Sequence, residues 1–484
     1  AFGVPDTFLL SLQILYMVFD CLDLDDVKNA SLVCKRWCNI IFSSAYISRF
    51  VLKIDVRKCD PKLQGSWQRM EELELSKELQ LDVQATTKRV IDIALHSERR
   101  YRNLNCVIVP LGDPEIPLLW ESLYTQWSSR LQSLELYIFD AKSVAELLPS
   151  IASAIQMMPD LHSLTLRKWK DEPFIYFHSP TNLLSSTVKQ VTIDSVCNIR
   201  IDMPQLQTFI GPFSAICHSA NIAQPDALGN LKHLTLTIEE EYYDWKNITQ
   251  TELSIIRRLT HLETFEYMCF HNNKIFIAIC ETCNKLKTLR LAIPPDTPSI
   301  FDHLTKLNHL HQLEVKVCFG VSEIPQLNLS PLTKLEKLTV QCRYLNSLIL
   351  PKSVKILNIE TYRDIHRIVI QTILKYNMQL TELTLKMADL NSYELNEILQ
   401  ILPVLKNLEV LEFSGGTFGK SDFLCINTPV DRLRRLKFNN CHLETKEILG
   451  LKEKFPNLKI LDFSYSTRML ERHPSFKSET IVFA

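Results

Sequence analysis

The strongest constraint on this chain is an apolar pattern, L-x-x-L-x-L, that returns along most of its length. Clear copies are "LQSLELYIF" at 131, "LHSLTLRKW" at 161, "LKHLTLTI" at 231, "LKTLRLAI" at 286, "LHQLEVKVCF" at 310, "LEKLTVQC" at 335, "VKILNIET" at 354, "LTELTLKM" at 380, "LEVLEFSG" at 408, "LRRLKFNNCHL" at 433 and "LKILDFSYS" at 458. Weaker copies begin at 188, 206 and 262. Because side chains alternate between the two faces of a strand, each copy predicts a short strand with its leucines on one side.

The copies return at a regular period, since those at 408, 433 and 458 are 25 residues apart. Periods of about 20 to 29 residues are typical of leucine-rich repeats, in which a strand and a following helix cover one core. Segments 143–158, 366–377 and 392–405 carry apolar residues three and four positions apart, as such helices require. The sequence therefore predicts an α/β solenoid, a leucine-rich-repeat horseshoe, over residues 131–466.

The regular repeats are flanked by less regular segments. "FVLKIDV" from 50 and "NLNCVIV" from 103 alternate like strands, so residues 49–130 are expected to form degenerate repeats that cap the stack. The spacing is irregular at 170–188 and 211–230, where we expect protruding loops. Residues 467–484 are assigned as a C-terminal tail.

Composition limits the classes of function. The chain has 54 Lys and Arg against 55 Asp and Glu, so its net charge of -1 favours neither nucleic acid nor an anionic membrane as partner. No apolar run reaches the roughly 18 residues of a membrane helix. The 14 cysteines are scattered without a paired framework, which is typical of reduced thiols and predicts a cytoplasmic or nuclear location.

Residues 1–48 carry two amphipathic helical patterns ahead of the repeats. One face of the first pattern consists of Ile14, Leu15, Val18, Phe19 and Leu22. After a helix-start signal at Asp25-Asp26, the second pattern consists of Ala30, Val33, Trp37 and Ile40. So short a module cannot bury both faces internally, and we expect it to dock on a partner. A cap on the solenoid is the alternative.

This stretch resembles an F-box, whose family pattern is roughly L-P-x-E-I-L-x-x-I-F-x-Y-L-x-x-x-D-L, then A-S-x-V-C-K-x-W. The matching residues are Leu10, Ile14, Leu15, Val18, Phe19, Leu22, Ala30, Ser31, Val33, Cys34, Lys35 and Trp37. Ser11 and Gln13 stand where the pattern has proline and glutamate. An F-box followed by leucine-rich repeats is a recognised combination.

The resemblance implies a substrate-recognition subunit of an SCF ubiquitin ligase, with no catalysis or cofactor of its own. Its F-box would bind the Skp adaptor and, through it, a cullin, while the repeats would bind an unknown protein substrate. The implied adaptor contacts are Leu10, Ile14, Leu15, Val18, Phe19, Leu22, Val33, Cys34 and Trp37. Trp37 could also join the helices to one another. A leucine-rich scaffold with F-box-like caps, and a small-molecule sensor like the plant hormone receptors of this architecture, are the alternatives.

Candidate substrate contacts are the side chains beside the inward leucines, because they point to the concave face. Tyr137 and Arg290 are among them, and basic residues concentrate in "DRLRRLKF" near the end of the repeats. Our hypothesis is that Arg435 and Lys437 bind an acidic or phosphorylated segment, since guanidinium groups match carboxylate and phosphate. An ordinary solvated face is the alternative.

Two short motifs invite a chemical role that their context does not favour. "SGGTFGKS" from 414 resembles a phosphate-binding loop but has Ser414 where the loop requires glycine, so a repeat turn is the simpler interpretation. "CETC", from Cys280 to Cys283, lacks the second ligand pair of a metal site, and buried packing is the simpler role. We predict no catalytic or metal site.

Overall fold

The computed structural model divides the chain into two compact units, Ala1–Leu228 and Gly229–Ala484. Besides a few isolated positions, it describes residues 12–43, 46–55, 101–108, 127–138, 141–168, 180–193, 199–218, 228–237, 248–267, 273–293, 298–317, 327–342, 347–361, 379–387, 392–444, 448–468 and 477–482.

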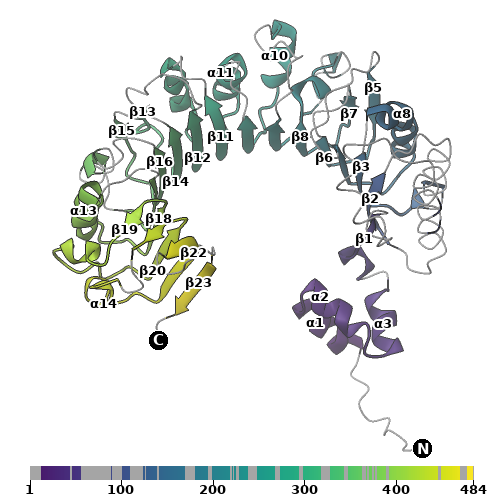
Figure 1. Cartoon of the computed structure of the whole chain (residues 1–484). Helices are drawn as coiled ribbons and strands as arrows, with labels where there is room; N and C mark the ends of the chain where they lie inside the picture. The colour runs from purple at the N-terminus through teal and green to yellow at the C-terminus, as the bar shows by residue number, and fades with distance from the viewer. Residues whose placement is uncertain are drawn as a thin grey trace, which may run out of the picture. The chain divides into compact units, whose positions relative to one another are not determined.

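The first unit begins with helices and continues as a parallel sheet (Figure 1). Its helical elements are α1 (Leu12–Cys21), α2 (Leu24–Ala30), α3 (Lys35–Ile41), η1 (Ile47–Arg49), α8 (Ala141–Gln156) and η2 (Phe213–Ala215). Its strands are β1 (Val51–Asp55), β2 (Asn103–Ile108), β3 (Ser133–Ile138), β4 (Ser163–Lys168), β5 (Thr181–Leu184), β6 (Gln190–Ile193), β7 (Ile199–Asp202) and β8 (Thr208–Gly211). The main sheet pairs β1, β2, β3, β4, β6 and β8 in that order, and β5 pairs with β7.

The second unit is a longer parallel sheet with helices between its strands. Its helical elements are α10 (Gln250–Ile256), α11 (Asn273–Thr282), η4 (Pro298–Lys306), α13 (Ser392–Ile401), η5 (Leu402–Val404), η6 (Asp422–Cys425) and α14 (Leu451–Lys454). Its strands are β9 (His233–Leu236), β10 (Thr264–Tyr267), β11 (Thr288–Ile293), β12 (Gln312–Val317), β13 (Leu327–Asn328), β14 (Lys337–Cys342), β15 (Leu348–Ile349), β16 (Ile356–Thr361), β17 (Glu382–Met387), β18 (Val410–Ser414), β19 (Thr417–Phe418), β20 (Arg435–Asn439), β21 (His442–Leu443), β22 (Ile460–Arg468) and β23 (Lys477–Val482).

The sheet of the second unit pairs β9, β10, β11, β12, β14, β16, β17, β18, β20 and β22 in parallel and in chain order. Two shorter parallel ladders join β13 to β15 and β19 through β21 to β22. Strand β23 pairs antiparallel with β22. A parallel strand repeated once per sequence copy is the arrangement of a solenoid.

The repeated leucines explain the register of this ladder. Leu289 pairs with Leu313, which pairs in turn with Leu338, and all three are buried. Equal pattern positions therefore stack on one another, so each leucine row completes a continuous core. Each predicted copy coincides with a strand, including the weaker copies at 188, 206 and 262, which form β6, β8 and β10. The horseshoe curvature stays a prediction.

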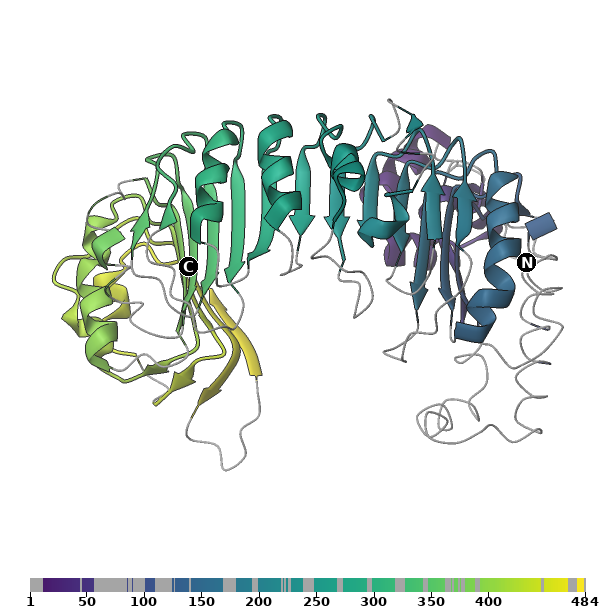
Figure 2. The same cartoon turned by 90° about the horizontal axis from the view of Figure 1, so that it is seen from above.

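The helices between strands, α8 in the first unit and α10, α11, α13 and α14 in the second, lie on one face of the strands of their unit (Figures 1 and 2). Helices α8 and α13 confirm the helical predictions for 143–158 and 392–405, whereas most of 366–377 falls outside the described residues. The opposite face of the strands, called the open face from here on, carries the side chains that alternate with the buried leucines. This is the face predicted to be concave.

The two segments predicted to be protruding loops are partly wrong, because both contribute to the folded core. Strand β5 lies within 170–188 and pairs with β7, while residues 170–179 fall outside the described residues. Within 211–230, the side chains of Phe213 and Leu228 are buried. These residues fill the core without the leucine spacing, so the repeat pattern did not reveal them.

The C-terminal end of the repeats differs from the prediction, and the N-terminal end is described only in part. Residues 467–484 are not a simple tail, because β22 extends to Arg468 and β23 covers its edge with an antiparallel strand. An uncovered edge would leave a row of unpaired backbone groups, which β23 satisfies. In the predicted cap, 49–130, β1 and β2 pair as the first two strands, and most of the intervening chain falls outside the described residues.

Candidate protein-binding surface

The helices before the sheet pack around Phe19, whose side chain is fully buried. Its ring meets the Trp37 ring edge-on at 5.3 Å between centroids and the Tyr46 ring at 6.1 Å. Further buried side chains of this small core are Leu15, Val27, Ala30, Ile40, Ile41, Ile47 and Phe50. Trp37 thus joins α3 to α1, the structural role that the sequence left open for it.

The carboxyl end of α1 is held by side chains from beyond α3. Arg49 donates from Nη1 to the carbonyl oxygen of Phe19 and from Nη2 to that of Leu22, each at 3.0 Å. Tyr46 Oη donates to the carbonyl oxygen of Tyr16 at 2.9 Å. Burial and the neighbouring Asp20 carboxylate raise the pKa of Tyr46 to about 12. The module therefore extends to Arg49 rather than ending at the predicted residue 48.

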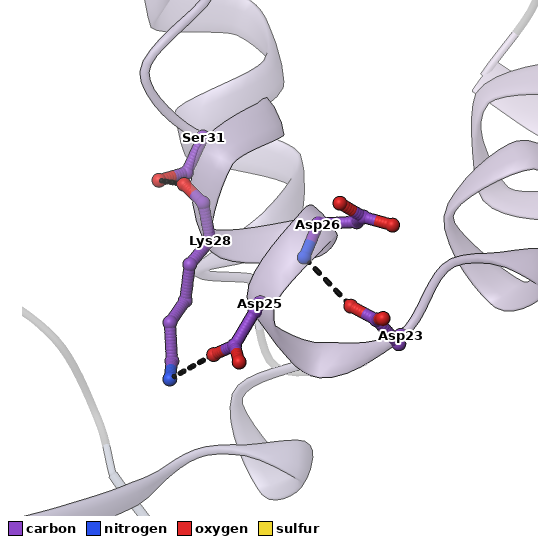
Figure 3. A network of polar contacts seen from close by, with 5 residues as sticks. All are labelled: Asp23, Asp25, Asp26, Lys28 and Ser31. Carbon is purple, nitrogen blue, oxygen red and sulfur yellow. Dashed lines mark hydrogen bonds and ion pairs between the residues drawn. The ribbon is translucent and has the colours of Figure 1, made fainter. Parts of the chain in front are cut away.

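Helix α2 begins where the sequence signal indicated, because Asp25 and Asp26 lie in its first turn. The Asp23 side chain accepts from the Asp26 N–H at 2.8 Å, so Asp23 is the N-cap (Figure 3). Asp25 forms an ion pair with Lys28 at 2.9 Å. At the other end of the helix, the Ser31 hydroxyl donates to the Lys28 carbonyl oxygen at 2.6 Å and adds to the bond from the Ser31 N–H to the same oxygen.

Replacing the cap tests this assignment. We expect Asp23→Ala to destabilise α2 by about 1 kcal/mol, because the Asp26 N–H loses its acceptor. Hydrogen exchange of the α2 amides measures the change. The matched control is Asp25→Ala, which removes only an exposed ion pair and should cost about 0.3 kcal/mol. Equal losses in the two variants would contradict the cap.

The outward side of the module is apolar in two places. On α1, Ile14, Met17 and Val18 are 45%, 68% and 41% exposed. They lie at positions i, i+3 and i+4, so they share one helical face. In the turn between α2 and α3, Leu32 and Val33 are 83% and 63% exposed. We call these five residues the apolar patch.

Five of the nine predicted adaptor contacts divide into an exposed set and a buried set. Ile14, Val18 and Val33 belong to the apolar patch, whereas Leu15 and Phe19 are 1% and 0% exposed and cannot touch a partner surface. The helical spacing placed Ile14, Leu15, Val18 and Phe19 on one face, although a helix buries only part of a wide apolar stripe. Sequence reasoning missed Met17 and Leu32, of which Met17 follows Ile14 at helical spacing.

The remaining predicted contacts have different positions. Cys34 is exposed and is the N-cap of α3, where its Sγ accepts from the Trp37 N–H at 3.5 Å. Leu22 and Trp37 are half-buried. Leu10 and Ser11 fall outside the described residues. Contact of any of these side chains with an adaptor stays a prediction.

Two of the predicted substrate contacts on the open face are already occupied by neighbouring side chains. Tyr137 Oη donates to Glu135 Oε1 at 2.9 Å. Arg290 lies between Glu266 and Glu314 of the adjacent strands, with nitrogen to oxygen distances of 3.5 and 3.4 Å. The Arg290 contacts follow from in-register pairing, which the sequence predicts only once the repeats are aligned, whereas Tyr137 and Glu135 lie on the same strand.

The pair Arg435 and Lys437 is less available to an anion than the sequence suggested. Lys437 Nζ lies 3.4 Å from Glu412 Oε2, and Lys437 pairs in register with Asp462 on its other side. Arg435 Nε is buried without a hydrogen-bond partner. Lys437 thus already faces a carboxylate, and contact of either residue with an acidic substrate segment stays a prediction.

The two short motifs take structural positions. In "SGGTFGKS", the Gly419 N–H donates to Asp422 Oδ2 at 2.7 Å, so a carboxylate occupies the place an anion would need. In "CETC", Cys280 and Cys283 are buried, and burial raises the pKa of both thiols, to about 11 for Cys283. Among the described residues, no cluster of His, Cys, Asp and Glu could hold a metal ion. Nor does any described helix have the length and hydropathy to cross a membrane.

Comparison with known proteins identifies the class of the helical module. The F-box-like family model matches residues 12–52, the segment that contains α1, α2, α3 and η1. Among solved structures, a crystal structure of a TLR13-ssRNA13 complex is similar at 16% identity and a TM-score of 0.34, covering 71% of this chain and 56% of that one. This chain thus spans little more than half of that structure's length. The assignment of a repeat fold is based on the strand pairing described above and not on this similarity. A search among curated proteins finds no match.

Proposed function

We propose that the chain is the substrate-recognition subunit of an SCF-type ubiquitin ligase. The apolar patch on the F-box-like module carries this proposal, because it leaves large apolar side chains in water on a module matched by a family whose members bind Skp adaptors. The chain itself would be non-catalytic. Its repeats would hold the protein to be ubiquitinated, in the cytoplasm or the nucleus, and a cullin would join through the adaptor.

Physical reasoning explains why an adaptor helix would bind this patch. Exposed apolar patches bounded by polar residues mark interaction sites, since covering them removes apolar surface from water. Lys28 and Arg36 flank the patch in sequence and suit a polar rim, while Trp37 and Phe19 keep the helices beneath it in place. An adaptor helix laid into such a patch would use its own apolar face.

The alternative function is a scaffold in which the F-box-like helices only cap the repeats. It predicts that the apolar side chains of these helices are buried instead of exposed. A cap buries its apolar side chains against the stack it covers, whereas Leu32 and Val33 are exposed. One contact between the module and the first repeats, from Asn103 Nδ2 to the Phe50 carbonyl oxygen at 3.3 Å, comes from β2 and lies beyond α3. This observation favours the adaptor function.

Direct binding tests the proposal. The purified full chain should bind a purified Skp adaptor tightly and form a ternary complex when a cullin is added, as measured by calorimetry and size-exclusion chromatography. Circular dichroism on the same sample establishes that the chain is folded. A folded chain that binds no adaptor would overturn the proposal and leave the scaffold function in its place.

A further inference from the structure

The edge of the second unit's sheet, where its parallel strands begin, carries two rows of side chains, which we call the basic rim. The inner row consists of the residues directly before the strands: Lys232, Glu263, Lys287, His311, Glu336, Lys355, Thr381, Glu409, Arg434 and Lys459. The outer row lies before it in each repeat: Asn230, His261, Lys285, His309, Lys334, Ser353, Gln379, Asn407, Arg432 and Asn457. Most of these side chains are exposed.

Backbone hydrogen bonds hold the rim in register. The Lys287 N–H donates to the Glu263 carbonyl oxygen at 2.9 Å, and His311 donates to Lys287 at 2.8 Å. The same bond continues from each inner-row residue to the previous one, through to Lys459 and Arg434 at 2.8 Å. Neighbouring rim positions are therefore about one strand spacing, roughly 4.8 Å, apart. The rim is therefore a continuous track of side chains whose spacing is set by the sheet.

Positive charge is concentrated on this track although the chain as a whole has a net charge of -1. The outer row contains no Asp or Glu, and the acidic residues of the inner row are Glu263, Glu336 and Glu409. The lysines and arginines of the two rows, which outnumber them, are Lys232, Lys285, Lys287, Lys334, Lys355, Arg432, Arg434 and Lys459. The net charge of the whole chain does not reveal this excess of positive charge, because acidic residues outside the rim balance it.

Two of the acidic side chains of the rim, Glu263 and Glu336, are compensated within it. Lys287 Nζ lies 2.7 Å from Glu263 Oε2, and Lys355 Nζ lies 2.9 Å from Glu336 Oε1. The hydrogen bond from Lys287 lowers the pKa of Glu263, and that from Lys355 lowers the pKa of Glu336. Both carboxylates are therefore ionised and paired, and the excess positive charge comes from both rows, the outer of which has no acidic residue.

Two lysines of the outer row have an imidazole as partner instead of a carboxylate. Lys285 Nζ lies 3.1 Å from His261 Nδ1, and Lys334 Nζ lies 3.1 Å from His309 Nδ1. An ammonium group only donates, so each imidazole contributes a lone pair and no negative charge. The charges of Lys285 and Lys334 are thus left without a counter-charge in these contacts. A ligand that brings carboxylates would supply it.

We propose that the basic rim binds an extended acidic segment of a partner protein. The carboxylates of this segment would lie along the outer row, at Lys285 and Lys334 in its centre and Arg432 towards its end. Charge complementarity makes such contacts specific to acidic partners and accelerates their association. The rim, instead of Arg435 and Lys437 on the open face, is then where acidic segments bind.

The rim suits a polypeptide better than a nucleic acid. Glu263, Glu336 and Glu409 interrupt the positive charge and would repel a continuous phosphate backbone, whereas a peptide can place polar residues opposite them. Neither row contains Phe, Tyr or Trp, on which the bases of a single strand would stack. Only the consequence of binding, delivery of the partner to a ligase, rests on the proposed function.

Charge reversal in the full chain tests the inference. The probe is a dye-labelled peptide of alternating glutamate and serine, and its fluorescence anisotropy gives the dissociation constant at low and at physiological salt. We expect Lys285→Glu with Lys334→Glu to weaken binding by about tenfold, since two attractions become repulsions. The control, Lys375→Glu with Lys420→Glu, makes the same change in net charge at exposed positions outside the rim and should alter binding by less than about twofold.

Three outcomes would overturn the inference. The first is that the wild-type chain does not bind the peptide. The second is that the rim variant and the control weaken binding equally. The third is that a single-stranded oligonucleotide of equal charge binds more tightly than the peptide. Adaptor binding is measured on the same variants and should be unchanged, because the substitutions lie in the second unit. Loss of peptide binding with intact adaptor binding therefore supports the rim, and a failure of the adaptor assay leaves this result untouched.

Discussion

Substituting aspartate for both Leu32 and Val33 is expected to abolish adaptor binding while leaving the fold intact. The two side chains are 83% and 63% exposed, so the substitutions create no cavity and bury no charge in the free chain. In the complex, two carboxylates would lie in an apolar contact without partners. Because each central contact of this kind is worth about 2 kcal/mol or more, we expect affinity to fall at least about a hundredfold in calorimetry.

A matched control separates a contact effect from a general effect of exposed aspartate. Met157, which follows α8, is 64% exposed, similar to Val33, and lies outside the F-box-like domain. Met157→Asp should bind the adaptor like the wild-type chain. If the double variant keeps full affinity, or if its thermal unfolding shifts markedly, the patch is not the adaptor contact.

The largest effect on stability is expected from Phe438→Ala on β20. Phe438 is fully buried and its ring lies 4.9 Å from that of Phe418 and 5.4 Å from that of Phe463, which joins neighbouring repeats through one aromatic cluster. Removing a buried ring leaves a cavity that stacked strands cannot collapse. We expect the free energy of opening β18, β20 and β22 to fall by about 3 to 5 kcal/mol, as measured by hydrogen exchange of their amides.

Phe438→Leu is the control for this prediction, since it keeps most of the apolar volume and should cost less than about 1.5 kcal/mol. The change should remain local to the neighbouring repeats, because each repeat of a solenoid contacts only its neighbours. A loss below about 1 kcal/mol in the alanine variant would mean that the ring contributes little packing.

The strand positions could be predicted from the sequence because the information for them is local. The last two leucines of each copy are two residues apart, so an extended segment buries them on one side, and stacking equal copies satisfies both their side chains and their backbone groups. The F-box-like helices were recognisable for the same reason, from spacing and motif within about 40 residues. Segments that fill the core without that spacing, such as Phe213 or β23, could not be found in this way.

The candidate site was predicted only in part, because burial depends on what packs against each side chain. Leu15 and Val18 both belong to the apolar stripe of α1, yet Leu15 is 1% exposed and Val18 is 41% exposed. The sequence spacing is the same for a residue that faces α3 and for one that faces solvent. The division of that stripe into a core and an exposed patch required the positions of all the helices.

The distribution of charge shows most clearly which properties the sequence determines and which depend on the tertiary structure. The sequence determined the repeats, the F-box-like helices and the balance of charges over the whole chain, since each depends on residue type and local spacing. Only the tertiary structure decided that Lys437 meets Glu412 on the open face while Lys285 and Lys334 meet imidazoles on the rim. The reason is that in-register stacking places residues about 24 or 25 positions apart side by side, and the sign of each neighbour decides whether a charge is compensated.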